Sequence, residues 1–517
     1  MGAPDLSGRD RLTWNVLAGW AGSLVEIAMG FVVPRLMDRH LGQTMLGIWD
    51  LSWSCVSYFG YAQVGIAPAT SRFMARCRAM GDVAGLRRVA SSTVGVSLGV
   101  AAVVLALTAI VTSALPLFLG KQLGDELATA QWVVAILGVS LALDYACEVF
   151  SGVLTGSHRW DLHVALNVVS NVVSAVAMVA TLLLGGGLVA VALAHAAGGV
   201  VSELLRILVA YRVLPELRIR PADFSLAQAR AMLSFGTKAS VPAVAWLVMA
   251  QSNVLIITAH LGPAALALYS RPAALLRFPE LLVRRVAMVL SPTASSLQGV
   301  GRHAEIRELV VQGTRAATAL TVPAMLVLLI LGGPLLHVWM GPDYAQGLVV
   351  AILALGATPV LTLRPARAIL NGLNLHGFVA LESTLAALLG IALCVVNVLV
   401  LDLGLVGAAL AVSIPQFALG LVVPFYVSSK LGIRLADILQ GGYLVPVLCA
   451  VPFGVVLLAS RLAFAAQPLL AVGVGSAAGA LVLLPLYWKY VAPQQLRQLV
   501  LARLPEALLR RPSRVAS

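Results

Sequence analysis

The sequence predicts an all-α polytopic membrane protein with about 14 transmembrane helices. Of its 517 residues, 60% are hydrophobic and only 11% are charged, and the mean hydropathy is +0.94. A soluble protein carries about 25% charged residues, so a soluble core cannot enclose this much apolar surface. An outer-membrane barrel would alternate apolar and polar residues over about 10 positions. Here the apolar residues form long runs instead.

Each apolar run is about as long as one bilayer crossing, which needs roughly 20 residues. The runs fall near residues 12–34, 46–67, 89–115, 127–153, 163–184, 187–211, 239–259, 269–291, 316–337, 347–370, 378–401, 407–428, 443–460 and 469–491. The first run is longer than the core of a signal peptide and lacks a clear small-residue cleavage site. We therefore expect it to be retained as the first span.

The surplus positive charge, +13 overall, gathers in alternate loops. The cationic loops follow spans two, six and fourteen, with Arg72, Arg76, Arg78, Arg87 and Arg88, then Arg212, Arg218, Arg220, Arg230 and Lys238, then Arg497, Arg503, Arg510, Arg511 and Arg514. By the positive-inside rule these loops and both termini face the cytoplasm of a bacterial inner membrane. Orientation explains the charge, so we expect no nucleic-acid partner, and the basic tail is expected to contact anionic membrane lipids.

An internal repeat relates the two halves of the chain. His40-Leu41-Gly42 with Trp49 recurs 220 positions later as His260-Leu261-Gly262 with Tyr269. The repeated unit holds six spans, an even number, so both copies enter the membrane from the same side, as in some transporters. We expect an N-terminal six-helix lobe at 1–212, a cytoplasmic linker at 213–238, a C-terminal six-helix lobe at 239–430, and two additional helices with a basic tail at 431–517.

These turns, together with the loop from Pro292 to Arg307 that contains Gly301, resemble the polysaccharide exporters and lipid-linked oligosaccharide flippases of the multidrug/oligosaccharidyl-lipid/polysaccharide exporter superfamily. The resemblance covers roughly residues 10 to 430. It implies fourteen spans and movement of an undecaprenyl-diphosphate-linked glycan from the inner to the outer leaflet by alternating access, without nucleotide hydrolysis. Drug and ion antiporters share this fold, so the fold alone does not choose the cargo.

Span eight is unusual because it holds four arginines and a glutamate: Arg271, Arg277, Glu280, Arg284 and Arg285. At 100° per residue, Arg277, Glu280 and Arg284 share one helix face. Guanidinium groups bind phosphate oxygens bidentately and stay charged when desolvated. We therefore expect Arg277, Arg284 and Arg271 to bind the diphosphate. In the alternative, Arg271 and Arg285 reach the interfaces and Glu280 neutralises Arg277 structurally.

Carboxyl groups inside spans are candidates for carrying a coupling ion. We expect Glu26, Asp50 or Glu280 to serve a proton or sodium gradient, or to balance the cavity's positive charge. A second expected set, a cytoplasmic gate, consists of Asp144 and Glu148 in span four and Arg364 and Arg367 in span ten. Simple interfacial anchoring is the alternative. The spacings of Glu203 with Arg206 and of Asn167 with Asn171 favour pairing within or between helices.

The sequence favours a flippase for a surface polysaccharide precursor, such as a lipopolysaccharide or exopolysaccharide unit. A proton- or sodium-coupled multidrug exporter is the alternative, but its cationic cargo would favour a carboxylate-rich cavity. A glycan polymerase would need a long outer catalytic loop, and every predicted outer loop is short. We expect no enzyme activity, catalytic residue, metal site or bound cofactor. A glycan polymerase or glycosyltransferase is an expected partner.

Overall fold

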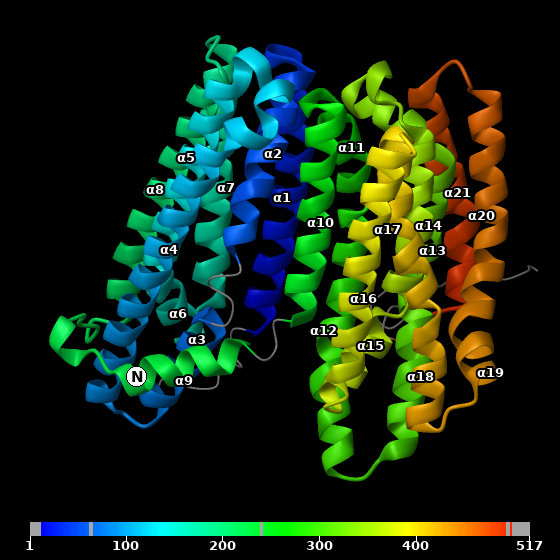
Figure 1. Cartoon of the computed structure of the whole chain (residues 1–517). Coiled ribbons are helices and arrows are strands. Elements are labelled where there is room, and N and C mark those ends of the chain that lie inside the picture. Colours follow the sequence, from blue (N-terminus) through cyan, green and yellow to red (C-terminus); the bar gives the residue numbers. More distant parts are fainter. Residues whose placement is uncertain (1–11, 61–65, 238–240, 493–496, 499–517) are drawn as a thin grey trace, which may run out of the picture. The chain divides into compact units, whose positions relative to one another are not determined.

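The structure is a computed structural model that describes residues 12–60, 66–237, 241–492 and 497–498. Over these residues it contains helices and no strands (Figure 1). The first half comprises α1 (Leu12–Leu41), α2 (Gln43–Phe59), α3 (Ile66–Ala79), α4 (Val83–Leu123), η3 (Gly124–Glu126), α5 (Leu127–Ala146), α6 (Glu148–Gly156), α7 (Trp160–Leu183), α8 (Leu188–Val213), η4 (Pro221–Asp223) and α9 (Leu226–Thr237).

The second half begins with α10 (Val241–Leu261), α11 (Pro263–Leu275), α12 (Arg277–Gly299), α13 (His303–Met340), η5 (Pro342–Tyr344), α14 (Gly347–Thr362) and α15 (Arg364–Gly372). It continues with α16 (His376–Cys394), the π-helical η6 (Val395–Val400), α17 (Gly404–Gly420), α18 (Val422–Leu431), α19 (Leu435–Ile438), the π-helical η7 (Leu439–Leu444), α20 (Val445–Ala463) and α21 (Pro468–Tyr490).

The prediction of an all-α membrane protein with about 14 spans is confirmed. Among the described residues, nine helical stretches are long and apolar enough to cross a bilayer. The longest, Val83–Ala146, combines α4 and α5 and therefore provides two crossings. The remaining predicted spans correspond to α1, α2, α10 and the consecutive pair α11 and α12.

The internal repeat reappears in the helix boundaries. The starts of α2 and α11, of α4 and α13, and of α5 and α14 lie 220 residues apart. The starts of α6 and α15, of α7 and α16, and of α8 and α17 lie 216 apart, which indicates a small deletion in the second copy. Backbone conformation repeats too: Gly42 and Gly262 precede α2 and α11 with φ of 86° and 85°. Only glycine adopts this conformation without strain, so this turn is conserved between the two copies.

The chain forms two compact units, and each is described by itself. Unit 1 comprises Met1–Arg271 and Ala380–Val412, and unit 2 comprises Pro272–Val379 and Ser413–Ser517. The predicted lobe boundaries stay a prediction. Inside the predicted linker, α9 packs against α3 and α4 of unit 1. The predicted positions of the two termini fall on residues outside the described part of the chain.

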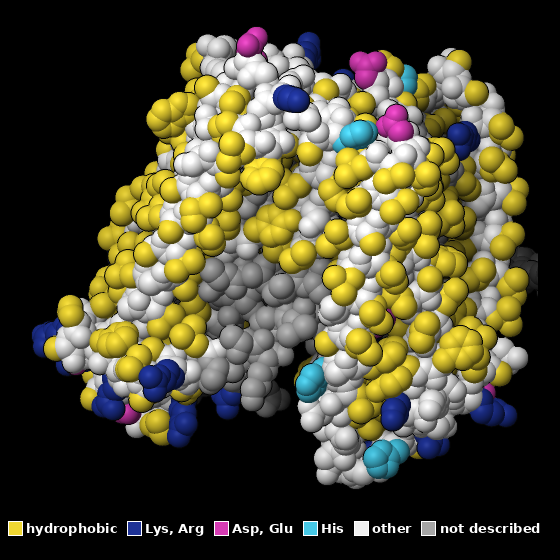
Figure 2. Space-filling model, viewed as in Figure 1, with side chains coloured by type: hydrophobic (Ala, Val, Ile, Leu, Met, Phe, Trp, Pro, Cys, Tyr) yellow, Lys and Arg dark blue, Asp and Glu magenta, His cyan; other side chains and the backbone are white. Residues whose placement is uncertain are grey.

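In unit 1, α8 packs against α5, α6 and α7, and α1 packs against α7. Large apolar side chains cover the outer face of α4, where Leu117 and Phe118 are 82% and 75% exposed. Figure 2 shows apolar side chains along α4 and α5 and Lys and Arg side chains gathered near α9. Exposed apolar surface of this extent fits contact with lipid.

In unit 2, α13 packs against α12, α14 and the hairpin of α20 and α21. At the other side of the same unit, α12 packs on α15 so closely that a Cβ added to Gly372 would lie 2.3 Å from the Ser291 carbonyl oxygen. In unit 1 the equivalent contact is between Gly156 of α6 and the Ser71 carbonyl oxygen of α3, which would lie 2.9 Å from a Cβ added to Gly156. The repeat therefore preserves a helix-packing contact as well as the helix boundaries.

Candidate functional site

A buried ion pair joins α2 to α11 within unit 1. The Arg271 guanidinium Nη2 donates to both carboxylate oxygens of Asp50, at 2.6 Å to Oδ1 and 2.5 Å to Oδ2. The two side chains are 6% and 16% exposed. The Arg271 Nε is also buried and has no hydrogen-bond partner in the described residues. The structure thus brings together one predicted phosphate ligand and one predicted counter-charge, and leaves a spare donor on the arginine.

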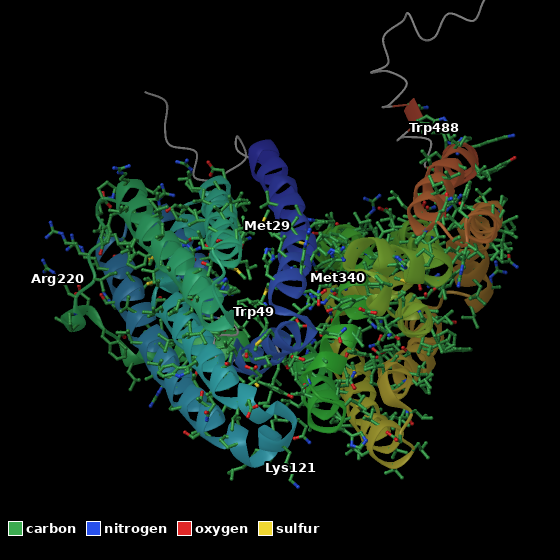
Figure 3. The ribbon with its side chains drawn as sticks, turned by 90° about the horizontal axis from the view of Figure 1, so that it is seen from above. Met29, Trp49, Lys121, Arg220, Met340 and Trp488 are labelled. Atoms are coloured by element: carbon green, nitrogen blue, oxygen red, sulfur yellow. The ribbon has the colours of Figure 1, made fainter. Side chains whose placement is uncertain are left out.

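Aromatic rings surround the same part of α2, and the sequence analysis assigned them no role. Trp49 is 9% exposed and lies inside the bundle of unit 1 (Figure 3). The rings of Trp49 and Trp53 contact each other edge-on, and the His195 ring from α8 contacts both, with its centroid 6.1 Å from Trp49 and 5.3 Å from Trp53. Trp49 and Trp53 are one helix turn apart, and their packing against each other and against His195 fixes the position of α2 next to Asp50. The position of Trp49 in the repeated turn was the available signal.

Span eight is divided between two helices, which corrects the expectation of one continuous run from 269 to 291. α11 ends at Leu275 and α12 begins at Arg277. Pro279 explains the break, because proline lacks an N–H and its ring collides with the carbonyl four residues earlier, that of Leu275. Arg271 consequently lies on a different helix from Arg277 and Arg284.

On α12 of unit 2, Arg277 and Arg284 are exposed. Glu280 lies between them in the sequence, but its Oε1 accepts from Arg364 Nη1 of α15 at 2.8 Å. The structural alternative in which Glu280 neutralises Arg277 is therefore wrong. Within the described residues, neither Arg277 nor Arg284 forms an ion pair or a hydrogen bond. A charged group that faces hydrocarbon costs several kcal/mol. The exposure of both arginines therefore favours water next to this face of α12.

The four predicted gate residues lie at equivalent breaks in the repeat. Asp144 and Glu148 flank the break between α5 and α6, and Arg364 opens α15 after the break that follows α14. Glu148 and Arg364 are 216 residues apart, the offset of this part of the repeat. Arg367 donates to the Val360 carbonyl oxygen at 2.9 Å. Their gating role stays a prediction.

The remaining predicted ion-coupling residue, Glu26, lies on α1 with an exposed side chain. Its role in ion coupling, or in balancing the positive charge of the cavity, stays a prediction. The spacing of Glu203 and Arg206 does correspond to an ion pair, at 2.8 Å within α8. Arg206 also donates to Asn167 on α7, so the predicted pairing extends between helices.

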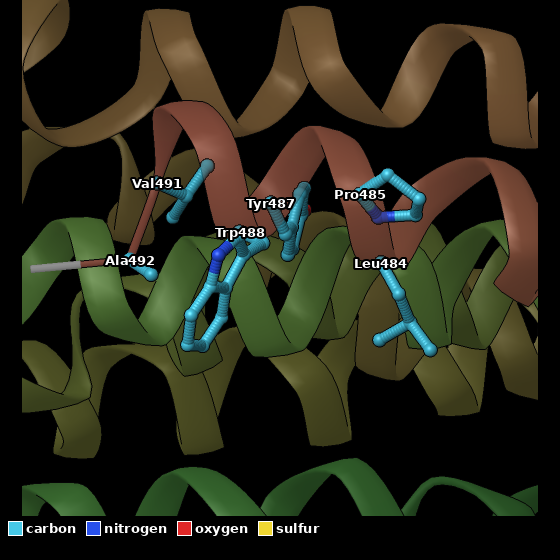
Figure 4. Close-up of a pocket in the computed structure, with 6 residues that line it drawn as sticks. All are labelled: Leu484, Pro485, Tyr487, Trp488, Val491 and Ala492. Carbon is cyan, nitrogen blue, oxygen red and sulfur yellow. The ribbon is translucent and has the colours of Figure 1, made fainter. Parts of the chain in front are cut away.

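One surface groove lies at the end of α21 in unit 2 (Figure 4). Its cavity volume is about 500 Å³, and it is lined by Leu484, Pro485, Tyr487, Trp488, Val491 and Ala492. None of these side chains is charged. The groove therefore offers no cationic side chain for an anionic headgroup, unlike the arginines of α11 and α12.

Comparisons with known proteins identify a family and a shared fold. Residues 82–348 match the polysaccharide biosynthesis protein family. The uncharacterised membrane protein EpsK of Bacillus subtilis is 22% identical over 445 residues, covering 83% of this chain and 86% of EpsK. The structure of the lipid II flippase MurJ in an inward closed conformation superimposes with a TM-score of 0.71 at 13% identity, covering 94% of this chain and all of that one.

An inward-facing multidrug-resistance MATE transporter of the MOP superfamily superimposes with a TM-score of 0.69 at 14% identity. The match covers 80% of this chain and 94% of that chain. Both solved structures are below 25% identity, so each shows a shared fold.

Proposed function

The chain belongs to the polysaccharide biosynthesis protein family, and from this membership we propose that it is a flippase for an undecaprenyl-diphosphate-linked oligosaccharide. It moves this surface polysaccharide precursor from the inner to the outer leaflet of the bacterial cytoplasmic membrane. The lipid anchor stays in the bilayer, while the diphosphate and sugars need a polar path through about 30 Å of hydrocarbon. A parallel repeat of two lobes supplies such a path by alternating access.

The observation that carries the proposal is the pair of exposed guanidinium groups of Arg277 and Arg284 on α12, which have no partner among the residues that the structure describes. They lie seven residues apart, about 10 Å along the helix. This spacing suits a diphosphate that contacts one arginine and then the next. Arg271, with its spare Nε, is the third proposed contact, and Asp50 holds it in position. A cationic drug would be repelled by this set, which favours an anionic cargo.

The proposed roles of the remaining charges follow from their partners. Glu280 lies beside the proposed diphosphate contacts and is paired with Arg364. If Arg364 left Glu280 and paired with Asp144 or Glu148, the new ion pair would provide a cytoplasmic gate. We place the protein among transporters and assign it no catalytic residue. A glycan polymerase that receives the flipped product is the partner we propose.

The test uses the full chain in proteoliposomes with a fluorescent undecaprenyl-diphosphate-linked N-acetylglucosamine. Arg277→Ala and Arg284→Ala should each reduce flipping by about tenfold or more, because charged hydrogen bonds to phosphate contribute roughly 1.5–3 kcal/mol each. Arg277→Lys should keep part of the rate, since lysine retains the charge but not the bidentate geometry. Arg434→Ala is the matched control, because Arg434 is exposed and pairs with Asp437 at the start of α19.

Two results would contradict the proposal. One is that the Arg277→Ala/Arg284→Ala double variant, correctly inserted in the membrane, flips the glycan lipid at the wild-type rate. The other is no glycan-lipid movement by the wild-type chain together with transport of a cationic dye such as ethidium, which would favour the multidrug exporter.

A further inference from the structure

A second cluster of ionisable groups is buried inside unit 1, on helices that carry none of the arginines of span eight. It lies where α8 packs against α5, α6 and α7. The groups that face it are Asp144 and Tyr145 from α5, Cys147 at the helix break, Glu148 from α6, His163 from α7, and Glu203 and Arg206 from α8. Three are carboxyl groups and one is a guanidinium.

The centre of the cluster is the pair of Glu203 and Arg206, which are 7% and 8% exposed. Arg206 Nη1 lies 2.8 Å from Glu203 Oε1. The same guanidinium donates to Ser151 Oγ of α6 at 3.0 Å and to Asn167 Oδ1 of α7 at 2.8 Å. One arginine thus ties three helices together.

Glu203 is left with an oxygen that nothing satisfies. Its Oε2 is buried and has no hydrogen-bond partner among the described residues. An unsatisfied carboxylate oxygen in an apolar interior costs several kcal/mol, and a bound proton removes most of that cost by neutralising the charge. The buried Glu203 is therefore suited to bind a proton when Arg206 donates only to Ser151 and Asn167.

Asp144 is a second carboxyl group close enough to Glu203 to interact with it electrostatically. A Cβ added to Gly199 of α8 would lie 3.8 Å from Asp144 Oδ1. Gly199 is one helix turn before Glu203, so the aspartate packs on the face of α8 that carries the pair. Asp144 is half-buried, whereas Glu203 is buried. The aspartate can therefore exchange protons with water more readily than the glutamate.

We propose that Asp144 and Glu203 bind and release the proton that drives transport, with Asp144 exchanging it with water and Glu203 holding it in the bundle. Asp144 forms an O–H bond with a proton taken from hydronium in water on one side. That bond breaks as an O–H bond on Glu203 forms, and the Glu203 bond breaks in turn when the proton returns to water on the other side. This inference rests on the proposed function, because the movement of the glycan lipid is what the proton would drive.

The contacts of Arg206 supply the coupling. When Glu203 is protonated its attraction for Arg206 weakens, and the guanidinium is left to Ser151 and Asn167. α6 begins after a break at Cys147, so it can reorient without carrying α5 along. A sodium ion suits this site poorly, because the Arg206 charge within 2.8 Å of the carboxylate repels a second cation.

A substrate-free experiment tests the proton site directly. Infrared difference spectra of the full chain in lipid nanodiscs, recorded between acidic and alkaline buffer, should show the C=O stretch of a buried protonated carboxyl group. The band should be lost in Glu203→Gln and shifted in Asp144→Asn. It should persist in Glu216→Gln, the matched control, since Glu216 is exposed in the loop after α8. A band unchanged in Glu203→Gln, or one that sodium abolishes at constant pH, would overturn the inference.

A transport experiment then tests the coupling. Proteoliposomes with the fluorescent undecaprenyl-diphosphate-linked N-acetylglucosamine should flip faster under a pH gradient than without it. In Glu203→Gln the two rates should become equal, while Glu216→Gln should keep the difference. Because Glu203→Gln strands Arg206, the double variant Glu203→Gln/Arg206→Gln provides a second protein without the buried charge, and the same loss is expected. Gradient stimulation that survives in either variant would refute the coupling.

The two experiments separate the two proposals. If the wild-type chain moves no glycan lipid under any gradient, the proposed function fails, while the infrared band still decides whether Glu203 holds a proton.

Discussion

Arg271 and Asp50 stabilise each other in surroundings that would tolerate neither charge alone. Removing one partner of a buried pair leaves an uncompensated charge and costs about 3–5 kcal/mol. We therefore expect Arg271→Ala to lower the apparent midpoint of thermal unfolding in detergent markedly. Asp50→Asn/Arg271→Gln, which removes both charges, should recover most of the loss.

Arg434→Ala is the control for that prediction, because the Arg434 side chain is exposed and its replacement should shift the midpoint little. If Arg271→Ala and Arg434→Ala unfold at the same temperature, the pair of Arg271 and Asp50 contributes no stability.

The sequence identified the individual charged residues inside spans, but not their partners. It flagged Arg271, Asp50 and Glu280 from their apolar surroundings alone. Asp50 pairs with a residue 221 positions away, and Glu280 with one 84 positions away. Which residue accepts a guanidinium depends on which helices pack together, and no local spacing encodes that.

At the scale of elements, small residues decide how closely the broken spans pack. Gly372 of α15 lies against the Ser291 carbonyl of α12, and an added Cβ would lie 2.3 Å away. Backbone cannot move aside easily, so Gly372→Ala should destabilise unit 2 by about 1–3 kcal/mol. The measurement is thermal unfolding of purified protein.

Gly377→Ala is the matched control, since nothing lies within 4 Å of its added Cβ. Both glycines are helical, Gly372 as the last residue of α15 and Gly377 as the second residue of α16, so the backbone accepts alanine at each position. Equal stabilities of the two variants would show that the contact between α12 and α15 does not require glycine.

The fourteen crossings were predictable because hydrophobicity adds up along a run of residues. The breaks inside spans were less visible. Those after α11, α14 and α17 precede Pro279, Pro365 and Pro424 by a few residues, so the signal was present. The break at Cys147 has no proline nearby and was not predictable. An apolar run predicts that a segment lies in the membrane, but it does not show where the helix within that segment breaks.

At the scale of the whole molecule, the distribution of charge sets the orientation in the membrane. Lys121 is exposed at the end of α4, and Arg220 is exposed beyond the end of α8, at the margin of unit 1 (Figure 3). The positive-inside rule places the cationic loop of Arg220 in the cytoplasm. In a cysteine-free background, we expect Lys121→Cys to react with a membrane-impermeant maleimide on intact cells.

Arg220→Cys should react only after the cells are permeabilised. The background requires replacement of the five native cysteines, Cys55, Cys77, Cys147, Cys394 and Cys449. Labelling of Arg220→Cys on intact cells would reverse the assigned orientation and with it the inner-to-outer direction of flipping.

The sequence by itself determined that this protein spans the membrane many times, that its two halves are parallel repeats, and that it resembles polysaccharide exporters. These properties follow from composition, run length and recurring turns, which are local or additive. The tertiary structure decided that Asp50 pairs with Arg271 and that Glu280 pairs with Arg364 instead of Arg277. It also decided that one oxygen of Glu203 has no hydrogen-bond partner among the described residues. Ion pairs form between whichever charges the packed helices bring within a few ångströms, and that choice is made only when the chain is folded.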